Sequence, residues 1–577
     1  MAATADRPEL RTCAVTGFGV DEEGRRLALA NAVAGVVMLA LGGAMAVLIA
    51  LQRQGLPISD DWWYRLVASH GATMLLFWLL LFEVAALYWG STMLLNARMR
   101  APRLAWGVFG AMVLGVALAQ WAMFSGNATV MFTAYPPLTA HPLYYLGILL
   151  FAGGVLVAIC IFFANLVAAR RERTYEGSLP LVVYGLAAAA IIGVYSLLSG
   201  AAAYLLLFLQ SVGVLEEVDP ALYRLLFWGI GHGAQQVNLA AMVAVWYALI
   251  ALTLGGKPVN EGLSRFAFLL YIAFIHLGAV HHLLVDPGLG TSHRIMNTSY
   301  LLYLAVLASL IHAFSIPAGM EAAQRERGIG KGLFGWLVRA PWREPGFSSL
   351  VLSVVYFGFI AGVSGVLMGT MQLNMIIHNT LFVVGHFHAT VVSGTTLAFM
   401  GISYYLLPLL ARRELVGTRI ARWQPYVFGG GVALLTLAML AAGQLGVPRR
   451  VADLGYADAP IGVAQFGEGA VPSIMALVSV GALLAVAGGV MFVWVMVRTL
   501  LVGERTDAPL QHLALRFGPR SEPVREPAPE LTHAGLSGRW ARFEAPGTYA
   551  IVLFFLAWFV ILYIAAHLNL AQSWPVG

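Results

Sequence analysis

Long apolar runs separated by short polar loops constrain this chain more than any other feature of its sequence. Its 577 residues are 60% hydrophobic and only 11% charged, and a water-soluble domain could not cover so much apolar surface with polar groups. A helix needs about 20 consecutive apolar residues to cross a bilayer. The sequence therefore predicts an all-α fold, a polytopic transmembrane helical bundle.

Thirteen segments are long and apolar enough to span. They are residues 27–51, 66–94, 104–124, 142–168, 180–211, 222–253, 265–285, 296–316, 350–372, 379–410, 425–445, 473–501 and 548–568. We expect the first twelve to form one catalytic core within residues 27–501, preceded by a tail at 1–26. A Pro-rich connection at 502–547, which contains "REPAPE", leads to the thirteenth helix and the C-terminus at 548–577.

The positive charges of the loops predict the orientation of the chain. Lys and Arg concentrate in cytoplasmic loops. If the N-terminus is cytoplasmic, 27 of the 34 Lys and Arg fall in cytoplasmic segments and six in outer ones, with Arg498 at a helix end. We expect a multi-pass protein of a prokaryotic cytoplasmic membrane, with residues 1–26 and 502–547 in the cytoplasm. The net charge of +6 follows from this bias, so we expect membrane lipid and no nucleic acid as a partner.

Six histidines fall at a similar depth, near the outer ends of the second, sixth, seventh and tenth predicted spans. Polar side chains are costly in hydrocarbon and mark functional sites there. A single histidine of this kind is more often a packing residue, but six at one depth favour a shared site. They are His70, His232, His281, His282, His386 and His388.

The two histidines of "GHFHATVV" are spaced so that they point toward different binding partners. His386 and His388 are about 200° apart around a helix, so they cannot serve one metal together. Each can be an axial ligand of a different planar cofactor, with the helix standing between the two. His70 is then left as the second axial ligand opposite His388.

The other pair favours convergence on a single ion. In "AVHHLLVDPG", His281 and His282 are about 100° apart around a helix. They can converge on one ion, with His232 as the third ligand. Three neutral imidazoles with an open position are typical of a reactive copper or iron site.

These stretches resemble subunit I of the haem-copper oxidase superfamily, closest to its B-type branch and the nitric oxide reductases related to it. In chain order they are "SHG", "YPPLTAHPLYYLG", "LEEVDPALYRLLFWGIGH", "HHLLVDPG", "HNTLFVVGHFHATV" and "GVPRR". The resemblance covers roughly residues 27–500. It implies a low-spin haem, a high-spin haem and a non-haem metal.

The resemblance also implies a role for each histidine. His70 and His388 would ligate the low-spin haem, and His386 the high-spin haem. The non-haem metal would be held by His232, His281 and His282. No acidic ligand accompanies these three, which favours copper over iron, because iron would prefer a carboxylate oxygen.

Further residues resemble positions near the haem propionates. Arg449 and Arg450 would pair with the propionates, because a guanidinium binds a carboxylate bidentately; the alternative is two ordinary loop charges. His378, Asn374 and Asp286 also resemble positions near the propionates. Asn374 stands where the B-type oxidases carry an aspartate, which removes the protonatable group from that position.

The chain departs from the oxidases one helical turn after His232. Oxygen-reducing A-type and B-type members have a tyrosine there, and this chain has Gln236. An amide cannot give up an electron and a proton as a phenol can, so this helix lacks the usual fourth reducing equivalent for splitting dioxygen. Related nitric oxide reductases place a glutamate or another polar, non-phenolic residue at this turn. The structural alternative is that Gln235 and Gln236 only hydrogen-bond between helices.

We therefore expect a respiratory reductase that joins two nitric oxide molecules, with two electrons and two protons, into nitrous oxide and water. The metals would act as Lewis acids and templates. A terminal oxidase that reduces dioxygen to water is the alternative. It needs another redox tyrosine, and Tyr271 lies ten residues before His281, farther than the tyrosine that C-type oxidases supply from this span. A membrane transporter is a second alternative, in which the six histidines are accidental.

The sequence gives fewer signals for the sources of the electrons and protons. Cys13 and Cys160 are the two cysteines and form neither a disulfide framework nor a Cys-x-x-Cys-His haem attachment. We therefore expect electrons from a second subunit of the CuA or haem c type, or from an external donor. Glu83, thirteen residues beyond His70, is a candidate for a proton route. Its alternative is a protonated acid bonded to a neighbouring helix.

Overall fold

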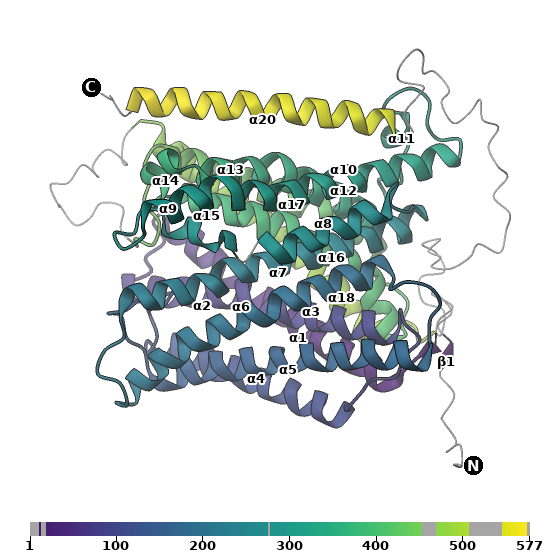
Figure 1. Cartoon of the computed structure of the whole chain (residues 1–577), viewed down its shortest axis with the longest axis horizontal. Helices are drawn as coiled ribbons and strands as arrows, with labels where there is room; N and C mark the ends of the chain where they lie inside the picture. The colour runs from purple at the N-terminus through teal and green to yellow at the C-terminus, as the bar shows by residue number, and fades with distance from the viewer. Residues whose placement is uncertain (1–10, 13–18, 275–276, 453–468, 507–544, 574–577) are drawn as a thin grey trace.

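The computed structural model describes residues 11–12, 19–274, 277–452, 469–506 and 545–573. Its elements are almost all helices, packed side by side in one bundle (Figure 1). The two strands in the described part of the chain, β1 (Arg11–Thr12) and β2 (Gly19–Val20), pair antiparallel ahead of the first helix. The all-α fold expected from the sequence is confirmed.

The helices follow one another along the chain with short connections. The α-helices are α1 (Glu22–Gln52), α2 (Asp60–Ala72), α3 (Trp78–Thr92), α4 (Pro102–Phe124), α5 (Pro142–Glu172), α6 (Leu181–Ser211), α7 (Pro220–Leu254), α8 (Glu261–Phe274), α9 (Thr291–Met296), α10 (Leu302–Glu326), α11 (Gly335–Val338), α12 (Pro345–Tyr356), α13 (Val363–Gly369), α14 (Met371–Ile377), α15 (Leu381–His388), α16 (Leu397–Ala411), α17 (Thr418–Gln444), α18 (Val471–Val502) and α20 (Pro546–Ser573). The π-helical segments are η1 (Thr73–Phe77), η3 (Asn297–Leu301), η4 (Phe357–Gly362) and η5 (Ala389–Thr396), and η2 (Leu277–Leu283) is a 3-10 helix.

Twelve helices within the described residues are long and apolar enough to cross a membrane, so the chain is a multi-pass membrane protein. The expected span at 265–285 differs from the others. It is α-helical as far as Phe274 and continues as η2 beyond residues 275–276, which lie outside the described residues. A cause is visible in η2, where Nδ1 of His281 bonds the carbonyl of Gly278, three residues back. That side chain competes for a backbone carbonyl that an α-helix would use.

Parts of the expected domain organisation lie outside the described residues. These parts are residues 1–10 and 13–18, with Cys13, and residues 507–544 of the Pro-rich connection. The thirteenth expected span is α20, which lies along the outside of the bundle (Figure 1). None of its most apolar 18-residue window is buried inside the protein, as expected for a helix whose surface faces lipid.

Polar caps fix where the histidine-bearing helices begin. Ser59 accepts a hydrogen bond from the backbone of Trp62 at the start of α2, and Asp219 accepts from the backbone of Leu222 at the start of α7. Thr380 accepts from the backbone of the second residue of α15. Each oxygen satisfies an amide that the first turn leaves free, so the register of each helix, and with it the direction of its histidines, is set locally.

Neighbouring helices approach closely through small residues. Gly115 of α4 faces Gly147 of α5, and a Cβ atom built on Gly115 would lie 2.6 Å from the carbonyl oxygen of Gly147. Only glycine allows the two backbones to approach this far, which is the usual way for membrane helices to gain packing energy.

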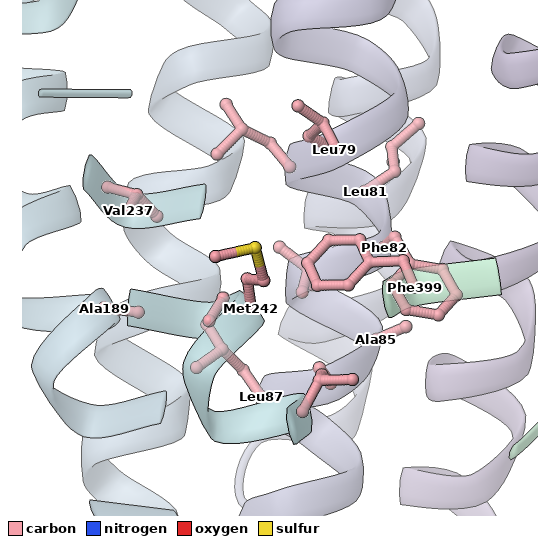
Figure 2. Packing of buried hydrophobic residues seen from close by; sticks show 14 of the residues in the cluster. Leu79, Leu81, Phe82, Ala85, Leu87, Ala189, Val237, Met242 and Phe399 are labelled. Atoms are coloured by element: carbon pink, nitrogen blue, oxygen red, sulfur yellow. The ribbon is translucent and has the colours of Figure 1, made fainter. Parts of the chain in front are cut away.

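The most enclosed spans are those that carry most of the histidines. In the spans Pro220–Leu254 and Leu381–Ala411, 89% of the most apolar window is buried, and in Asp60–Thr92 it is 83%. Their apolar side chains form the central core, where Phe82 packs against Phe399 and Met242 lies nearby (Figure 2). Histidines on these helices are therefore held by tight surroundings and directed by fixed rotamers.

Candidate haem and metal site

Three histidines from two separate elements converge. One ligand atom from each of His232, His281 and His282 lies within 4.8 Å of the other two. His232 comes from α7, and the other two come from η2. Nδ1 of His232 is 3.2 Å from Nε2 of His282. The sequence-based grouping of these three residues is reproduced, although the pair is carried by a 3-10 helix instead of an α-helix.

The orientation of each ring in this cluster has a physical cause. Nδ1 of His281 donates to the carbonyl of Gly278, which leaves Nε2 with a free lone pair. His282 is stacked on Trp228, with 3.8 Å between ring centroids and 3° between planes. Trp228 lies one turn before His232 on α7, so a single helix provides one ligand and the support for another. These are the supporting contacts that a metal site requires.

Gln236 contacts the cluster from behind His232. Its amide nitrogen lies 3.0 Å from Nε2 of that histidine, and its amide oxygen has no partner among the described residues. The oxygen and nitrogen of an amide have nearly the same shape, so their assignment follows the hydrogen bonds. With the amide turned over, the oxygen accepts from Nε2–H, and Nδ1 of His232, on the side of His282, would be the atom that binds a metal. The residues present thus fit a metal ion.

His70 and His388 form a second, separate pair. Their ring centroids lie 6.4 Å apart, and the ring planes differ by 12°. Nδ1 of His70 bonds the carbonyl of Gly42 at 2.9 Å, and Nδ1 of His388 bonds that of Val384 at 2.8 Å. Both Nε2 atoms therefore keep their lone pairs. These two residues would hold one haem iron between them if a haem is bound here.

His386 is held apart from that pair. Its Nδ1 lies 3.1 Å from Oγ of Ser364 on α13. A Cβ atom on Gly365 would come within 2.8 Å of the His386 ring, so glycine is required at this contact. His386 and His388 thus have different contacts in the protein, and their binding of two different haems stays a prediction.

One cavity of about 1040 Å³ connects these groups, and its lining includes His70, His282, His386 and His388. It is larger than the usual site for a single drug-sized ligand, about 300–1,000 Å³. The rest of its lining is mainly apolar, which suits the body of a porphyrin. The cavity and the facing imidazoles fit planar haem groups.

Cationic side chains gather where this cavity meets the loop after α17. Arg449 and Arg450 line the cavity. Burial, together with Arg450 and Arg224, lowers the pKa of Arg449 to about 9. An anionic group placed here would relieve this repulsion, and a haem carboxylate has the required charge.

The loop that carries the arginines is tied to the helix that carries two of the histidines. The backbone of Arg449 donates to the carbonyl of Asn379 at 3.0 Å, and Leu381 donates to Val447 at 2.8 Å. Nη2 of Arg449 also lies 3.4 Å from Oδ1 of Asn379. The arginine pair is therefore fixed relative to the start of α15.

The remaining expected propionate neighbours have partners of their own. Nδ1 of His378 lies 3.1 Å from Oδ1 of Asn374, and burial followed by the charge of Arg449 lowers the pKa of His378 to about 4. Asp286 pairs with Arg224 at 2.7 Å. Burial raises the pKa of Asp286, and Arg224 opposes the shift.

Two residues singled out in the sequence lie away from the cluster. The hydroxyl of Tyr271 bonds Ser309 of α10 at 2.9 Å, and its ring packs against His312. Glu83 is 4% exposed, and neither of its carboxyl oxygens has a partner among the described residues. Neither role of Glu83 is settled by these contacts, and its place on a proton route stays a prediction.

Sequence reasoning missed three residues of the site. Trp228 stood in the motif "FWGIGH", one turn before His232, and that spacing could have identified it. Arg224 precedes His232 in the longer motif "LEEVDPALYRLLFWGIGH", as a charged residue near the end of a span. Asn379 stood in the motif "HNTLFVVGHFHATV", but its contact with Arg449 joins segments 70 residues apart, which the sequence does not show.

The sequence model of the family described as "Cytochrome C and Quinol oxidase polypeptide I" matches residues 26–484. The chain belongs to this family. Members of this haem-copper oxidase subunit I family are membrane oxidoreductases of electron transport that bind haem and copper. The superfamily expected from the motifs is confirmed, and the B-type branch and the nitric oxide activity stay predictions.

Individual relatives agree with this membership. Cytochrome c oxidase subunit 1 of Thermus thermophilus is 32% identical over 469 residues, which make up 79% of this chain and 80% of that protein. The protein of the same name from Synechocystis sp. is 24% identical over 493 residues, 81% of this chain and 82% of that one. A solved structure described as a heme-copper terminal oxidase dimer has a TM-score of 0.78 at 24% identity, covering 95% of this chain and 92% of its own. It shares the fold.

Proposed function

We propose that this haem-copper oxidase subunit I reduces nitric oxide to nitrous oxide. The observation that carries the proposal is the absence of a phenol at the site. No tyrosine is among the described residues that line the large cavity, and Gln236 occupies the turn beside His232. Two-electron coupling of nitric oxide does not need the additional electron that a tyrosine supplies, whereas cleavage of dioxygen does.

The chain's residues divide into three tasks in this proposal. His70 and His388 hold the low-spin haem and His386 the high-spin haem, while His232, His281 and His282 hold the non-haem metal. When bound, these groups supply electrons and Lewis acidity to the substrate. Arg449 and Arg450 anchor the propionates, with Asp286, Asn374 and His378 beside them.

We favour copper over iron at the non-haem site. The residues that converge there are three imidazoles with no carboxylate among them, and iron would prefer an oxygen ligand. Metal analysis of the purified protein tests this choice directly. One copper per chain, with iron accounted for by extracted haem, supports it, and non-haem iron in place of copper contradicts it.

We also propose how the chain lies in the membrane and where its electrons come from. The chain lies in a prokaryotic cytoplasmic membrane with its N-terminus inside. Residues 27–501 form the catalytic core, and residues 502–547 connect it on the cytoplasmic side to the last helix. The described part of the chain offers Cys160 as a free, exposed thiol, which makes no copper pair or haem attachment. Electrons therefore come from a CuA or haem c subunit or from an external donor.

The experiment measures both reactions on one preparation. Nitrous oxide is quantified per haem under anaerobic conditions with nitric oxide, and dioxygen consumption is measured with the same electron donor. We expect rapid nitrous oxide formation and slow dioxygen reduction. The absence of nitrous oxide alongside rapid four-electron reduction of dioxygen would overturn the proposal.

A terminal oxidase is the second candidate, favoured by one finding. The relative from Thermus thermophilus, at 32% identity, is named a cytochrome c oxidase subunit 1. For dioxygen reduction the chain would need a redox phenol, and Tyr271 is bonded to Ser309 on the α10 side. Rapid dioxygen reduction that is abolished in Tyr271→Phe would support this second candidate.

A further inference from the structure

A buried polar bridge ties the span that carries His70 to α4. Gln120 of α4 bonds two hydroxyl residues of that span, Ser69 in the last turn of α2 and Thr73 at the start of η1. The hydroxyl of Ser69 donates to Oε1 of Gln120 at 2.5 Å, and Nε2 of Gln120 donates to Oγ1 of Thr73 at 2.5 Å. Both hydroxyl residues are 0% exposed. A hydroxyl can donate and accept, so the bridge is complete in either orientation of the amide.

The bridge crosses the point where the winding of the span changes. α2 ends at Ala72, and the π-helical segment η1 begins at Thr73. Short π-helical segments inside α-helices are rare and frequently lie at functional sites. His70 is about 100° from Ser69 and about 60° from Thr73 around the helix. A bond at each of these two positions therefore fixes the rotation of the helix and, with it, the direction of the His70 side chain.

Thr73 also lies beside the residue of α1 that bonds His70. Nδ1 of His70 is 2.9 Å from the carbonyl oxygen of Gly42. A Cβ atom built on Gly42 would lie 3.5 Å from Cγ2 of Thr73 and 2.2 Å from Sδ of Met74, so only glycine lets the backbone of α1 come this close. The Thr73 hydroxyl thus bonds Gln120, while its methyl group is near the glycine that accepts from His70.

We propose that Gln120 is a positioning residue for the low-spin haem. It acts through Ser69 and Thr73, and it keeps His70 in the orientation in which Nδ1 donates to the Gly42 carbonyl. Such a bond makes an imidazole a stronger electron donor, and hydrogen bonds to an axial ligand are one of the factors that set the potential of a haem. The inference rests on the proposed function only in taking His70 as a ligand of that haem.

Paramagnetic resonance spectra and a redox titration of the holoenzyme test this role without turnover. Gln120→Leu removes both bonds at similar volume, and the two hydroxyls left behind can bond carbonyls of their own helix. We expect changed g values of the low-spin haem and a higher midpoint potential, because a weaker bond from Nδ1 stabilises the oxidised iron less. The shift should be on the order of a tenfold change in the ratio of oxidised to reduced haem, which is about 59 mV for one electron.

A second buried glutamine provides the matched control. Gln424 of α17 is 0% exposed and accepts from the hydroxyl of Tyr404 at 2.9 Å. Neither residue is among the described residues that line the large cavity, so Gln424→Leu should leave the g values and the potential unchanged. Unchanged values in Gln120→Leu, or an equal shift in Gln424→Leu, would overturn the positioning role.

Substitutions of Thr73 test whether the hydroxyl carries the effect. Thr73→Val removes the hydroxyl at similar shape and should shift the potential in the same direction as Gln120→Leu. Thr73→Ser keeps the hydroxyl and should shift it less; an equal shift in the two variants would contradict the bridge.

The ligand assignment is tested separately by His70→Ala. A low-spin signal that persists in His70→Ala would overturn the assignment and this inference with it. Loss of the signal in His70→Ala, with no effect of Gln120→Leu, would overturn the positioning role alone. None of these measurements uses a substrate, so they give the same answer whether the protein reduces nitric oxide or dioxygen.

Discussion

Gln236 lies one helical turn after His232 and places its amide nitrogen 3.0 Å from Nε2 of that histidine. The contact is on the far side of the ring from Nδ1, which faces His282. A metal bound at Nδ1 requires a proton on Nε2, and the Gln236 oxygen is the acceptor at hand. In the proposed metal site Gln236 would therefore orient this ligand from behind, and it is absent from the described lining of the large cavity.

Replacing Gln236 with leucine removes that acceptor and keeps a similar volume. We expect metal affinity and nitric oxide turnover to fall roughly 10–100-fold, as for the loss of other groups that support a ligand, while both haems stay bound. Gln236→Glu keeps an acceptor oxygen and should retain the metal. Copper per haem and nitrous oxide per haem are measured for both variants. Equal values for wild type and Gln236→Leu would remove the orienting role.

The arrangement of His70 and His388 predicts that replacing either one removes a haem signal from the spectrum. In the proposed function these two residues hold the low-spin haem, so replacing either with alanine should remove the six-coordinate low-spin signal. His293→Ala is the control, because His293 is exposed on α9, and it should leave the spectrum intact. Optical and paramagnetic resonance spectra of membrane-inserted protein decide the outcome. A low-spin signal that persists in His70→Ala would contradict the assignment.

The sequence was most informative where periodicity and chemistry coincide. His386 and His388 differ by two positions, which puts them about 200° apart around a helix, and in the structure His386 contacts Ser364 while the ring of His388 lies beside that of His70. The similar predicted depth of His232, His281 and His282 in the membrane also indicated that these three residues lie together. These inferences needed only the local helix and its direction.

What the sequence did not predict depends on contacts between distant segments. The 3-10 winding of η2 follows from a side chain bonding its own backbone at Gly278, which helix periodicity does not encode. The sequence places Tyr271 ten residues before His281, but its hydrogen bond to Ser309 depends on which face of α8 is turned toward α10. The tie between Arg449 and Asn379 joins segments 70 residues apart.

Glu344 predicts a stability that depends on pH. Burial raises the pKa of this carboxyl to about 7, against the opposing effects of the Tyr405 hydrogen bond and the charge of Arg422. Between about pH 4.5 and pH 7 the folded protein holds a proton that the unfolded chain has released, so stability falls as the pH rises. The loss amounts to roughly 3 kcal/mol at most. Glu344→Gln should remove this slope.

Thermal midpoints in detergent across that pH window test the prediction. Glu504→Gln is the control, because Glu504 is exposed, and its slope should match that of the wild type. A wild-type stability that rises with pH through this window, or a slope unchanged in Glu344→Gln, would contradict the assignment.

A buried ion pair anchors the outermost helix of the bundle. Glu321 and Arg325 of α10 are 0% and 1% exposed and lie 2.6 Å apart. The Glu321 carboxylate also accepts from the backbone amides of Gly547 and Thr548, at 2.9 and 2.6 Å, in the first turn of α20. A carboxylate at a helix N-terminus satisfies free amides and interacts favourably with the helix dipole, so one side chain fixes the start of α20.

Glu321→Ala should therefore destabilise the protein without touching the cofactors. It removes the carboxylate that pairs with the buried guanidinium of Arg325, a loss of about 3–5 kcal/mol for pairs of this kind, and it frees the first turn of α20. We expect a lower thermal midpoint in detergent, with unchanged haem spectra in the protein that stays folded. Glu326→Ala is the matched control, because Glu326 is exposed on the same helix, and it should change stability by no more than about 0.5 kcal/mol. Equal midpoints for the two variants would show that this ion pair does not hold α20.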